Sequence, residues 1–261
     1  MPIPASELDG RVGSRILPEW IDVVDDPTQK EWRGRTLMGA FTLDLEGQLP
    51  MPVQVIEKGV LKDILRTRQP VRGFEGSNGH ARLGGGFGAK TAFLSNLFVQ
   101  ARQTSTAAEL KKRLIESATA RNKPYAILIR KMDYPSSASY GELQRLAGSM
   151  AQSGGTTRPV SPPILVYRIY ADGKEELVQG LRLRNFSVRS FRDIVAASDE
   201  SVAYDFIGNL APFSLMGAGG YVAPATVIAP AVLFEELELE HPQEERPTLP
   251  VVPPPPLIAG N

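Results

Sequence analysis

The chain has 261 residues with 29 Lys+Arg and 29 Asp+Glu, so its formal net charge is zero. This length is enough for one large domain with a packed core or for two smaller domains. The balanced charge argues against a nucleic-acid-binding protein, because affinity for phosphate backbones comes mainly from an excess of Lys and Arg.

The chain contains no cysteine, which excludes disulfides, thiolate catalysis and cysteine-ligated metals. No apolar run approaches the ~20 residues of a membrane-spanning helix. The first residues, MPIPASELDGRVG, lack the apolar core of a signal peptide. We therefore expect a cytoplasmic protein that does not bind a membrane.

The first half of the chain predicts short strands, because 24 Gly and 22 Pro make the chain turn often. Candidate strands cover residues 20–24, 36–45 and 53–56. Residues 53–65 also predict a hairpin in which Gly59 supplies a positive φ at a tight turn. Residues 73–91 are rich in glycine and predict a long loop, and 92–101 follow as a strand.

The middle of the chain contains two patterns typical of the first turn of a helix. Thr106 and Glu109 form a capping box, followed by apolar residues at helical spacing up to Asn122. A buried-type strand is expected over 125–132. Ser139 and Glu142 form a second capping box that opens another expected helix.

The last part of the chain predicts a linker over 153–163, a hairpin over 164–183 and a short helix with Ser190-x-x-Asp193 at its start. From residue 204 the pattern is again strand-like. With roughly nine or ten strands and about three short helices, we expect an α+β fold of predominantly antiparallel sheet, barrel- or roll-like. Residues 1–246 would form a single β-rich domain, and 247–261 a proline-rich tail.

The segment Gly84–Thr91 (GGGFGAKT) is one residue short of a phosphate-binding loop, with Ala89 where the last glycine should be. Such a loop needs a buried strand before it and a helix after it. Neither flank fits, so we interpret this segment as a glycine-rich loop without a nucleotide.

Only two histidines occur, His80 in the glycine-rich loop and His241 in an acidic segment near the end. A loop histidine can be a general base or a metal ligand, but no His-x-x-x-His or similar spacing supplies further ligands. We expect both side chains to be solvated and no metal to be bound by this chain.

Paired acids and serines offer little further chemistry. Asp25-Asp26-Pro27 is typical of a turn, and the glutamates from 235 to 245 are typical of a solvated strand face. Ser136, Ser137 and Ser139 have no histidine partner nearby in the sequence, so a Ser–His mechanism is weakly supported.

Two segments are candidates for holding an extended peptide. Residues 209–224 alternate small and apolar residues, which allows another backbone to approach closely or, alternatively, tight internal packing. The loop from 78 to 88 is the other candidate, through main-chain hydrogen bonds. The candidate peptide-binding residues are Asn78, Gly79, His80, Asn209, Gly217 and Gly219.

Several segments, taken in order, resemble the C-terminal half of the TldD/PmbA family, also called modulators of DNA gyrase and described as zinc metallopeptidases. The resemblance runs from about residue 15 to 240. It is carried by VVDDPT (23–28), IEKGVLK (56–62), SNGH (77–80), NLFV (96–99), KPYAILIRK (123–131) and APFSLMGAGG (211–220).

The resemblance implies a cytoplasmic protein that works as a dimer, either with itself or with a related subunit, and that degrades unfolded peptides. It also implies zinc in the family's active subunit, bound by an H-E-x-x-x-H helix and a cysteine near the glycine-rich segment. This chain has neither motif, and Met216 or a neighbour stands where the cysteine would be expected. No metal-binding or catalytic residue is therefore carried over.

Three hypotheses follow for the function. The first is a C-terminal-type domain that is non-catalytic alone and acts as a scaffold, a dimer half or the wall of a peptide channel. The second is a stand-alone hydrolase using His80 and nearby acidic residues. The third is a structural partner that regulates a related full-length subunit.

Overall fold

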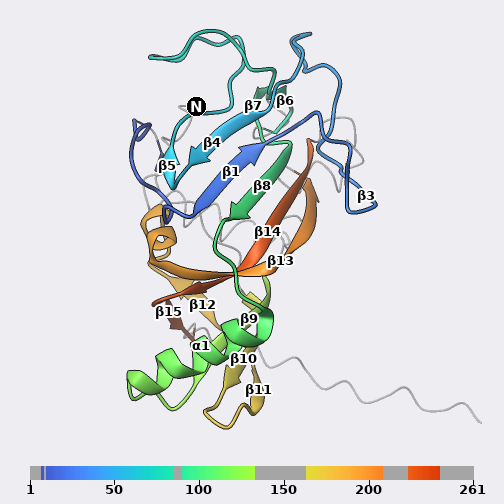
Figure 1. The fold of residues 1–261 in the computed structure, drawn as a ribbon. Helices are drawn as coiled ribbons and strands as arrows, with labels where there is room; N and C mark the ends of the chain where they lie inside the picture. The colour runs from blue at the N-terminus through green and yellow to red at the C-terminus, as the bar shows by residue number, and fades with distance from the viewer. Residues whose placement is uncertain (1–6, 9, 85–89, 133–162, 208–222, 242–261) are drawn as a thin grey trace, which may run out of the picture.

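The computed structural model describes residues 7–8, 10–84, 90–132, 163–207 and 223–241, which are coloured in Figure 1. Strands dominate these residues, with one α-helix and one 3-10 helix. No helix in this part of the chain combines the length and apolarity needed to cross a membrane.

The largest sheet has six strands in the order β13-β14-β8-β1-β4-β5. The strands are β1 (Ile21–Asp25), β4 (Val53–Glu57), β5 (Val60–Leu61), β8 (Asn96–Ala101), β13 (Ile194–Ile207) and β14 (Pro224–Phe234). All neighbours are antiparallel except β14 and β8, which run parallel. The expected predominance of antiparallel strands is confirmed. The described strands form an open sheet that ends at β13 and β5, so of the two expected forms, barrel-like or roll-like, no closed barrel is seen among them.

Smaller sheets surround this one. Three strands pair in the order β11-β10-β9, and three further pairs are isolated. Their bounds are β9 (Ala126–Met132), β10 (Pro163–Ile169), β11 (Glu175–Val178), β12 (Arg182–Arg184) with β15 (Glu238–Glu240), β2 (Glu31–Trp32) with β3 (Arg35–Thr36), and β6 (Ala81–Arg82) with β7 (Thr91–Ala92). Figure 1 shows β9, β10 and β11 at one end of the molecule, beside helix α1 (Ala107–Ala120).

The six-stranded sheet carries an apolar cluster on each face, because side chains alternate along a strand. On β8, Leu97 and Val99 pack against one cluster while Phe98 belongs to the other. The first cluster is built on Ile16, Leu17, Ile21, Val23, Ile56, Leu61 and Ile194. The second is built on Leu37, Phe98, Ala203 and Ile228, with Trp32 packed against it.

The expected hairpin around Gly59 is confirmed as β4 and β5. Lys58 and Gly59 both have positive φ, 49° and 73°, as a two-residue turn of type I′ requires. A Cβ on Gly59 would lie 2.2 Å from the carbonyl oxygen of Leu17. Only glycine therefore fits both the backbone conformation and the space.

The expected helix after Thr106 is confirmed as α1. The Thr106 hydroxyl accepts a hydrogen bond from the amide of Glu109, and the Glu109 carboxylate accepts one from the amide of Thr106. These bonds lower the pKa of Glu109. The helix ends just before Asn122, which has a φ of 53°.

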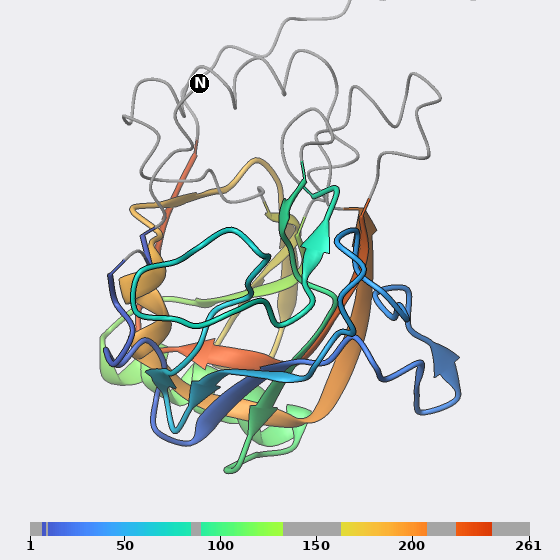
Figure 2. The ribbon, with the colours of Figure 1, turned by 90° about the horizontal axis from the view of Figure 1, so that it is seen from above.

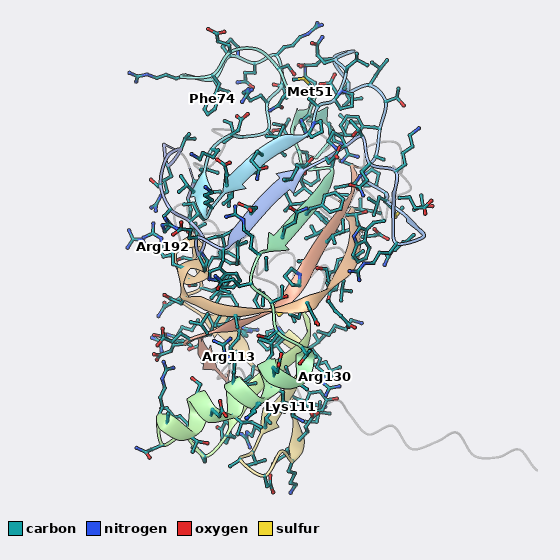
Figure 3. All side chains as sticks on the ribbon, in the orientation of Figure 1. Met51, Phe74, Lys111, Arg113, Arg130 and Arg192 are labelled. Carbon is teal, nitrogen blue, oxygen red and sulfur yellow. The ribbon has the colours of Figure 1, made fainter. Side chains whose placement is uncertain are left out.

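A carboxylate on β11 connects this helix to the three-stranded sheet. Glu175 accepts from Lys111 of α1 and from Arg130 of β9, both at 2.8 Å. Figure 3 labels both cations at this end of the molecule. The pKa of Glu175 is lowered, first by the hydrogen bond from Lys111.

Three expected elements differ from the structure. Residues 36–45 form no strand beyond Thr36, because side chains on β8 and β14 hydrogen-bond the backbone there in place of a partner strand. The short helix begins at Val188 and is capped by Ser187, so Asp193 is its last residue rather than part of its first turn. The expected strand 92–101 is interrupted, because Phe93, Leu94 and Ser95 lie between the short β7 and β8.

Several expectations concern residues outside the described ranges: the helix opening at Ser139, most of the linker 153–163 and the tail 247–261. The single-domain division at residue 246 stays a prediction. His241 and the glutamates at 235, 236, 238 and 240 are exposed, as expected.

Candidate functional site

Asn78, Gly79 and His80 lie together just before β6, and all three are buried. The His80 side chain has no exposed surface, so the expectation of a solvated loop histidine is wrong. Figure 2 views the molecule from the end opposite α1, and Figure 1 shows that the teal chain between β5 and β6 lies at this end. The segment has few bulky apolar residues, and its burial instead depends on hydrogen bonds.

The His80 ring bridges two elements of the molecule. Its Nε2 lies 3.1 Å from Oδ1 of Asp25 at the end of β1. Its Nδ1 lies 2.9 Å from the carbonyl oxygen of Asn78 and 3.1 Å from Oδ1 of the same residue. The Asn78 amide is oriented by its own bonds, since Oδ1 accepts from the amide of Arg66 and Nδ2 donates to the carbonyl of Ile64.

Asp25 collects donors from two directions. Besides the His80 ring, it accepts the main-chain N–H of Ser95, at 2.9 Å to Oδ2, and the Ser95 hydroxyl. Asp25 and Ser95, like His80, have no exposed surface. Both ring nitrogens of His80 therefore lie within hydrogen-bond distance of oxygen atoms, the Asp25 carboxylate on one side and Asn78 on the other.

This arrangement contains Ser, His and Asp but not in the order of a nucleophilic triad. The Ser95 hydroxyl donates to Asp25, not to His80, so the ring cannot take the hydroxyl proton directly. None of the three side chains reaches the surface. The cluster therefore holds the chain between β5 and β6 against the end of β1, rather than forming a reactive serine.

Arg82 on β6 adds a positive charge beside this network. It is 9% exposed, donates to the carbonyl of Leu94 at 2.7 Å and places its guanidinium 4.9 Å from the ring centre of Phe41. Burial lowers the pKa of Arg82 to about 10, and the Asp25 carboxylate opposes that shift. The same Phe41 ring meets the His80 ring edge-on.

A second set of buried polar side chains anchors the chain between β3 and β4. Asn96 accepts from the amide of Gly39 at 3.0 Å and donates to the carbonyls of Asp26 and Gln29. A Cβ on Gly39 would lie 2.2 Å from the carbonyl oxygen of Ser95, so only glycine allows this approach. In the sequence Asn96 stands only as the first residue of the NLFV segment, and no local pattern predicted this role.

Thr226 on β14 is the other buried anchor. Its hydroxyl accepts from the amide of Met38 at 3.0 Å and donates to Asp205 at 2.7 Å. Asp205 is in turn paired with Arg35 of β3 at 2.5 Å. Thr226 and Asn96 are opposite each other in the register of the parallel strands β14 and β8. Both anchors therefore stand at one end of the sheet.

The other three candidate residues, Asn209, Gly217 and Gly219, lie outside the described ranges. They belong to residues 208–222, which join the end of β13 at Ile207 to Ala223 before β14. These strand ends are at the same end of the sheet as Asn96 and Thr226. Contact of the six candidate residues with a peptide stays a prediction.

The zinc that the family resemblance implies does not fit the described residues. Both histidines of the chain are described: His80 has both nitrogens engaged with oxygen atoms, and His241 is exposed after β15. Across the described ranges, no group of three or more His, Asp or Glu side chains is placed to hold a metal ion. We derive no step through a metal in this chain.

One depression among the described residues has a volume of about 220 Å³ and is lined in part by Trp32, Arg33, Phe98, Asp199 and Ile228. Ligand pockets are usually larger, about 300–1,000 Å³. Its lining includes none of the residues that contact His80.

The fold and its network define a β-rich domain whose buried polar groups hold long loops to the end of one open sheet. The chain matches the family model described as the PmbA/TldA metallopeptidase C-terminal domain over residues 4–240. It therefore belongs to this family, as the resemblance indicated.

Solved structures share this fold. A candidate modulator of a DNA gyrase from Thermotoga maritima is 17% identical, with a TM-score of 0.58 over 90% of this chain and 42% of that chain. TldE from Thermococcus kodakarensis is 16% identical, with a TM-score of 0.54 over 89% of this chain and 42% of that chain.

Among sequence relatives, a metalloprotease of Archaeoglobus fulgidus is 33% identical over 81 residues, which are 31% of this chain and 18% of the relative. The chain thus spans less than half the length of each relative.

Proposed function

We propose that this chain is a non-catalytic scaffold within a TldD/PmbA-like metallopeptidase, forming one wall of a channel for unfolded peptides and one half of a dimer. The observation that supports it best is the state of His80, because this ring is buried and engaged at both nitrogens. A histidine that acts as a metal ligand or base needs a free lone pair. His80 has structural partners on both sides instead.

The main chain around His80 is also used internally. The His80 carbonyl accepts from the amide of Phe93, and the Ala81 carbonyl accepts from the amide of Leu45. The Ala81 amide donates to Asp44. We therefore assign Asn78, Gly79 and His80 to the support of the wall, beneath its surface.

Contact with the peptide is assigned to Asn209, Gly217 and Gly219. Their segment joins β13 to β14 at the end of the sheet where the buried anchors lie. Small residues let an extended backbone approach closely, and recognition through main-chain groups does not depend on the peptide's side chains.

The experiment is to purify the full chain and measure bound zinc, hydrolysis of a casein-derived unfolded peptide, and binding of that peptide by fluorescence anisotropy. We expect binding without hydrolysis and no stoichiometric zinc. The Gly217→Val variant should weaken binding at least about 10-fold, a change of about 1.4 kcal/mol. The control is Ala171→Val, at an exposed position of the turn between β10 and β11, which should bind as the wild type does.

Two results would contradict the proposal. Stoichiometric zinc with hydrolysis that a chelator abolishes would make the chain an enzyme by itself. If the chain did not bind the peptide, or if Gly217→Val bound it as tightly as the wild type, the chain would not form the wall of a peptide channel as proposed.

A further inference from the structure

Arg82 on β6 is a buried cation with spare hydrogen-bond donors. A guanidinium has five N–H groups, and among the described residues that of Arg82 donates only to the carbonyl of Leu94, at 2.7 Å. One face of the group is covered by the Phe41 ring, whose centre is 4.9 Å away. The other four N–H groups have no acceptor in the described part of the chain, although Arg82 is only 9% exposed.

The charge of Arg82 is also without a direct partner. No carboxylate of the described residues forms an ion pair with it. The Asp25 carboxylate acts on it only at a distance, because the Asp25 oxygens already accept from Ser95 and lie beside the His80 ring. Burial lowers the pKa of Arg82 to about 10, so the guanidinium stays charged at neutral pH.

A buried guanidinium normally has an anion beside it, since an unpaired buried charge is costly. Arg66 shows the usual arrangement, because its side chain is 12% exposed and is paired with Asp63. The N–H groups of a guanidinium form a planar fork that matches the two oxygens of a carboxylate. The free donors of Arg82 therefore suit a carboxylate that this part of the chain does not supply.

Arg82 lies near the segment to which peptide contact is assigned. Figure 1 shows β6 and β7 at the end of the molecule opposite α1. Leu94, which accepts from Arg82, follows Phe93, and the Phe93 ring meets the ring of Phe206 edge-on at 6.3 Å between centres. Phe206 stands at the end of β13, just before residues 208–222. The cation is thus placed close to the point where this segment leaves the sheet.

We propose that Arg82 binds the C-terminal carboxylate of a peptide held by this domain. Recognition through main-chain groups does not depend on the peptide's side chains, and the terminal carboxylate is the anion that every peptide with a free C-terminus carries. Because Arg82 is buried, water and salt screen its attraction to that carboxylate less than they would at the surface. The inference rests on the proposed function and adds a direction to the peptide, whose last residue would lie beside β6.

The test compares three forms of one fluorescent peptide that otherwise lacks Asp and Glu. The first has a free C-terminal carboxylate and the second a C-terminal amide. The third is amidated but contains one internal Glu, so that its carboxylate is on a side chain. Binding to the full chain is measured by fluorescence anisotropy for the wild type, Arg82→Gln and Arg82→Lys. The matched control is Arg33→Gln, because Arg33 also stacks on an aromatic ring, that of Trp32, but is exposed.

We expect the wild type to bind the free acid at least about 10-fold more tightly than either amidated peptide. Arg82→Gln should bind all three forms equally. Arg82→Lys should keep part of the preference, because it retains the charge but loses the fork, and Arg33→Gln should keep all of it.

Three results would overturn the proposal. The first is equal binding of acid and amide by the wild type, a comparison that does not require any variant to fold. The second is a preference for the free acid that survives in Arg82→Gln. The third is an internal Glu that restores the full affinity, which would assign the site to side-chain carboxylates.

Acetate separates this inference from the proposed function, because it offers a carboxylate without a peptide. Compared with chloride at the same ionic strength, acetate should raise the melting temperature of the wild type by about 2 °C and leave that of Arg82→Gln unchanged. A wild type that shows this shift but binds no peptide would contradict the proposed function while supporting a carboxylate site at Arg82. Absence of the shift, or an equal shift in Arg82→Gln, would count against the site itself.

Discussion

Replacing His80 by Ala is the most direct test of the buried network at the end of the sheet. The substitution removes the ring that connects Asp25 to Asn78 and leaves the Asp25 carboxylate with donors from Ser95 alone. All of this occurs without solvent, since His80, Asp25 and Ser95 have no exposed surface.

The expected loss of stability follows from that burial. Removing one partner of a buried hydrogen bond costs about 1–3 kcal/mol and more where a charged group such as a carboxylate is left without its donor. The total free energy of unfolding of a domain is about 5–15 kcal/mol. We therefore expect His80→Ala to lower the free energy of unfolding by about 3 kcal/mol.

The assay is urea denaturation followed by tryptophan fluorescence, since Trp20 and Trp32 each pack against a different apolar cluster. His241→Ala is the matched control, because His241 is exposed and its replacement should stay within about 0.5 kcal/mol of the wild type. If His80→Ala also stayed within that range, the ring would have no structural role and our reasoning would be refuted. A double-mutant cycle with Asp25→Asn should show a coupling energy of at least about 1 kcal/mol, and simple additivity would contradict the pair.

Three further predictions test the anchors and the helix contact. Gly79→Ala should lower the free energy of unfolding by about 3 kcal/mol and the control Gly73→Ala by about 1 kcal/mol. Both glycines have positive φ, but only at Gly79 would a Cβ meet main-chain atoms. Urea denaturation of both variants measures the difference, and equal losses would contradict the close contact. Asn96→Ala should cost about 2 kcal/mol by leaving a buried amide without an acceptor, and unchanged protection of that amide in hydrogen exchange would count against the anchor. The hydrogen bond from Lys111 is the first cause of the lowered pKa of Glu175, so the stabilisation by this carboxylate is present above the ordinary pKa of 4.5 and is lost as pH falls through the lowered pKa. Glu175→Gln should therefore make the melting temperature fall less steeply in acid. A melting temperature with the same pH dependence as the wild type would disprove this.

The elements that sequence analysis predicted correctly are those determined within a few residues of one another. The capping box of Thr106 and Glu109 starts α1, and both partners lie within one turn. The hairpin at Gly59 depends on a single position where only glycine has the required φ and space. In each case local stereochemistry decides the structure before any distant contact forms.

The sheet order could not be derived in the same way. β14 and β8 pair in parallel although more than a hundred residues of chain lie between them, and β13 extends the sheet beyond β14. No local pattern encodes which strand meets which, since β-structure depends on neighbours supplied by the fold. For the same reason strand content alone, which suggested a barrel- or roll-like sheet, did not predict the open order of the described sheet.

The environment of His80 was predicted wrongly because burial of a polar loop is a tertiary property. Its partner Asp25 lies 55 positions earlier, and the composition around it, SNGHAR, is that of a solvated turn. His80 can be buried because both nitrogens of its ring lie within hydrogen-bond distance of oxygen atoms. The neighbours Asp25 and Asp26 have different environments that the local sequence does not distinguish. The Asp26 carboxylate accepts a hydrogen bond from the amide of Thr28 in a turn, whereas Asp25 is fully buried.

The same end of the molecule reverses the usual distribution of side chains. Asn96, Thr226 and His80 are inside, while Leu45 and Leu49 are exposed above them. Burying polar groups costs free energy unless every one is paired, and exposing leucines forgoes the gain from burying them. His80, Asn96 and Thr226 avoid the first cost, because each has hydrogen-bond partners. The inverted pattern thus argues that paired hydrogen bonds, rather than burial of these leucines, hold the loops to this end of the domain.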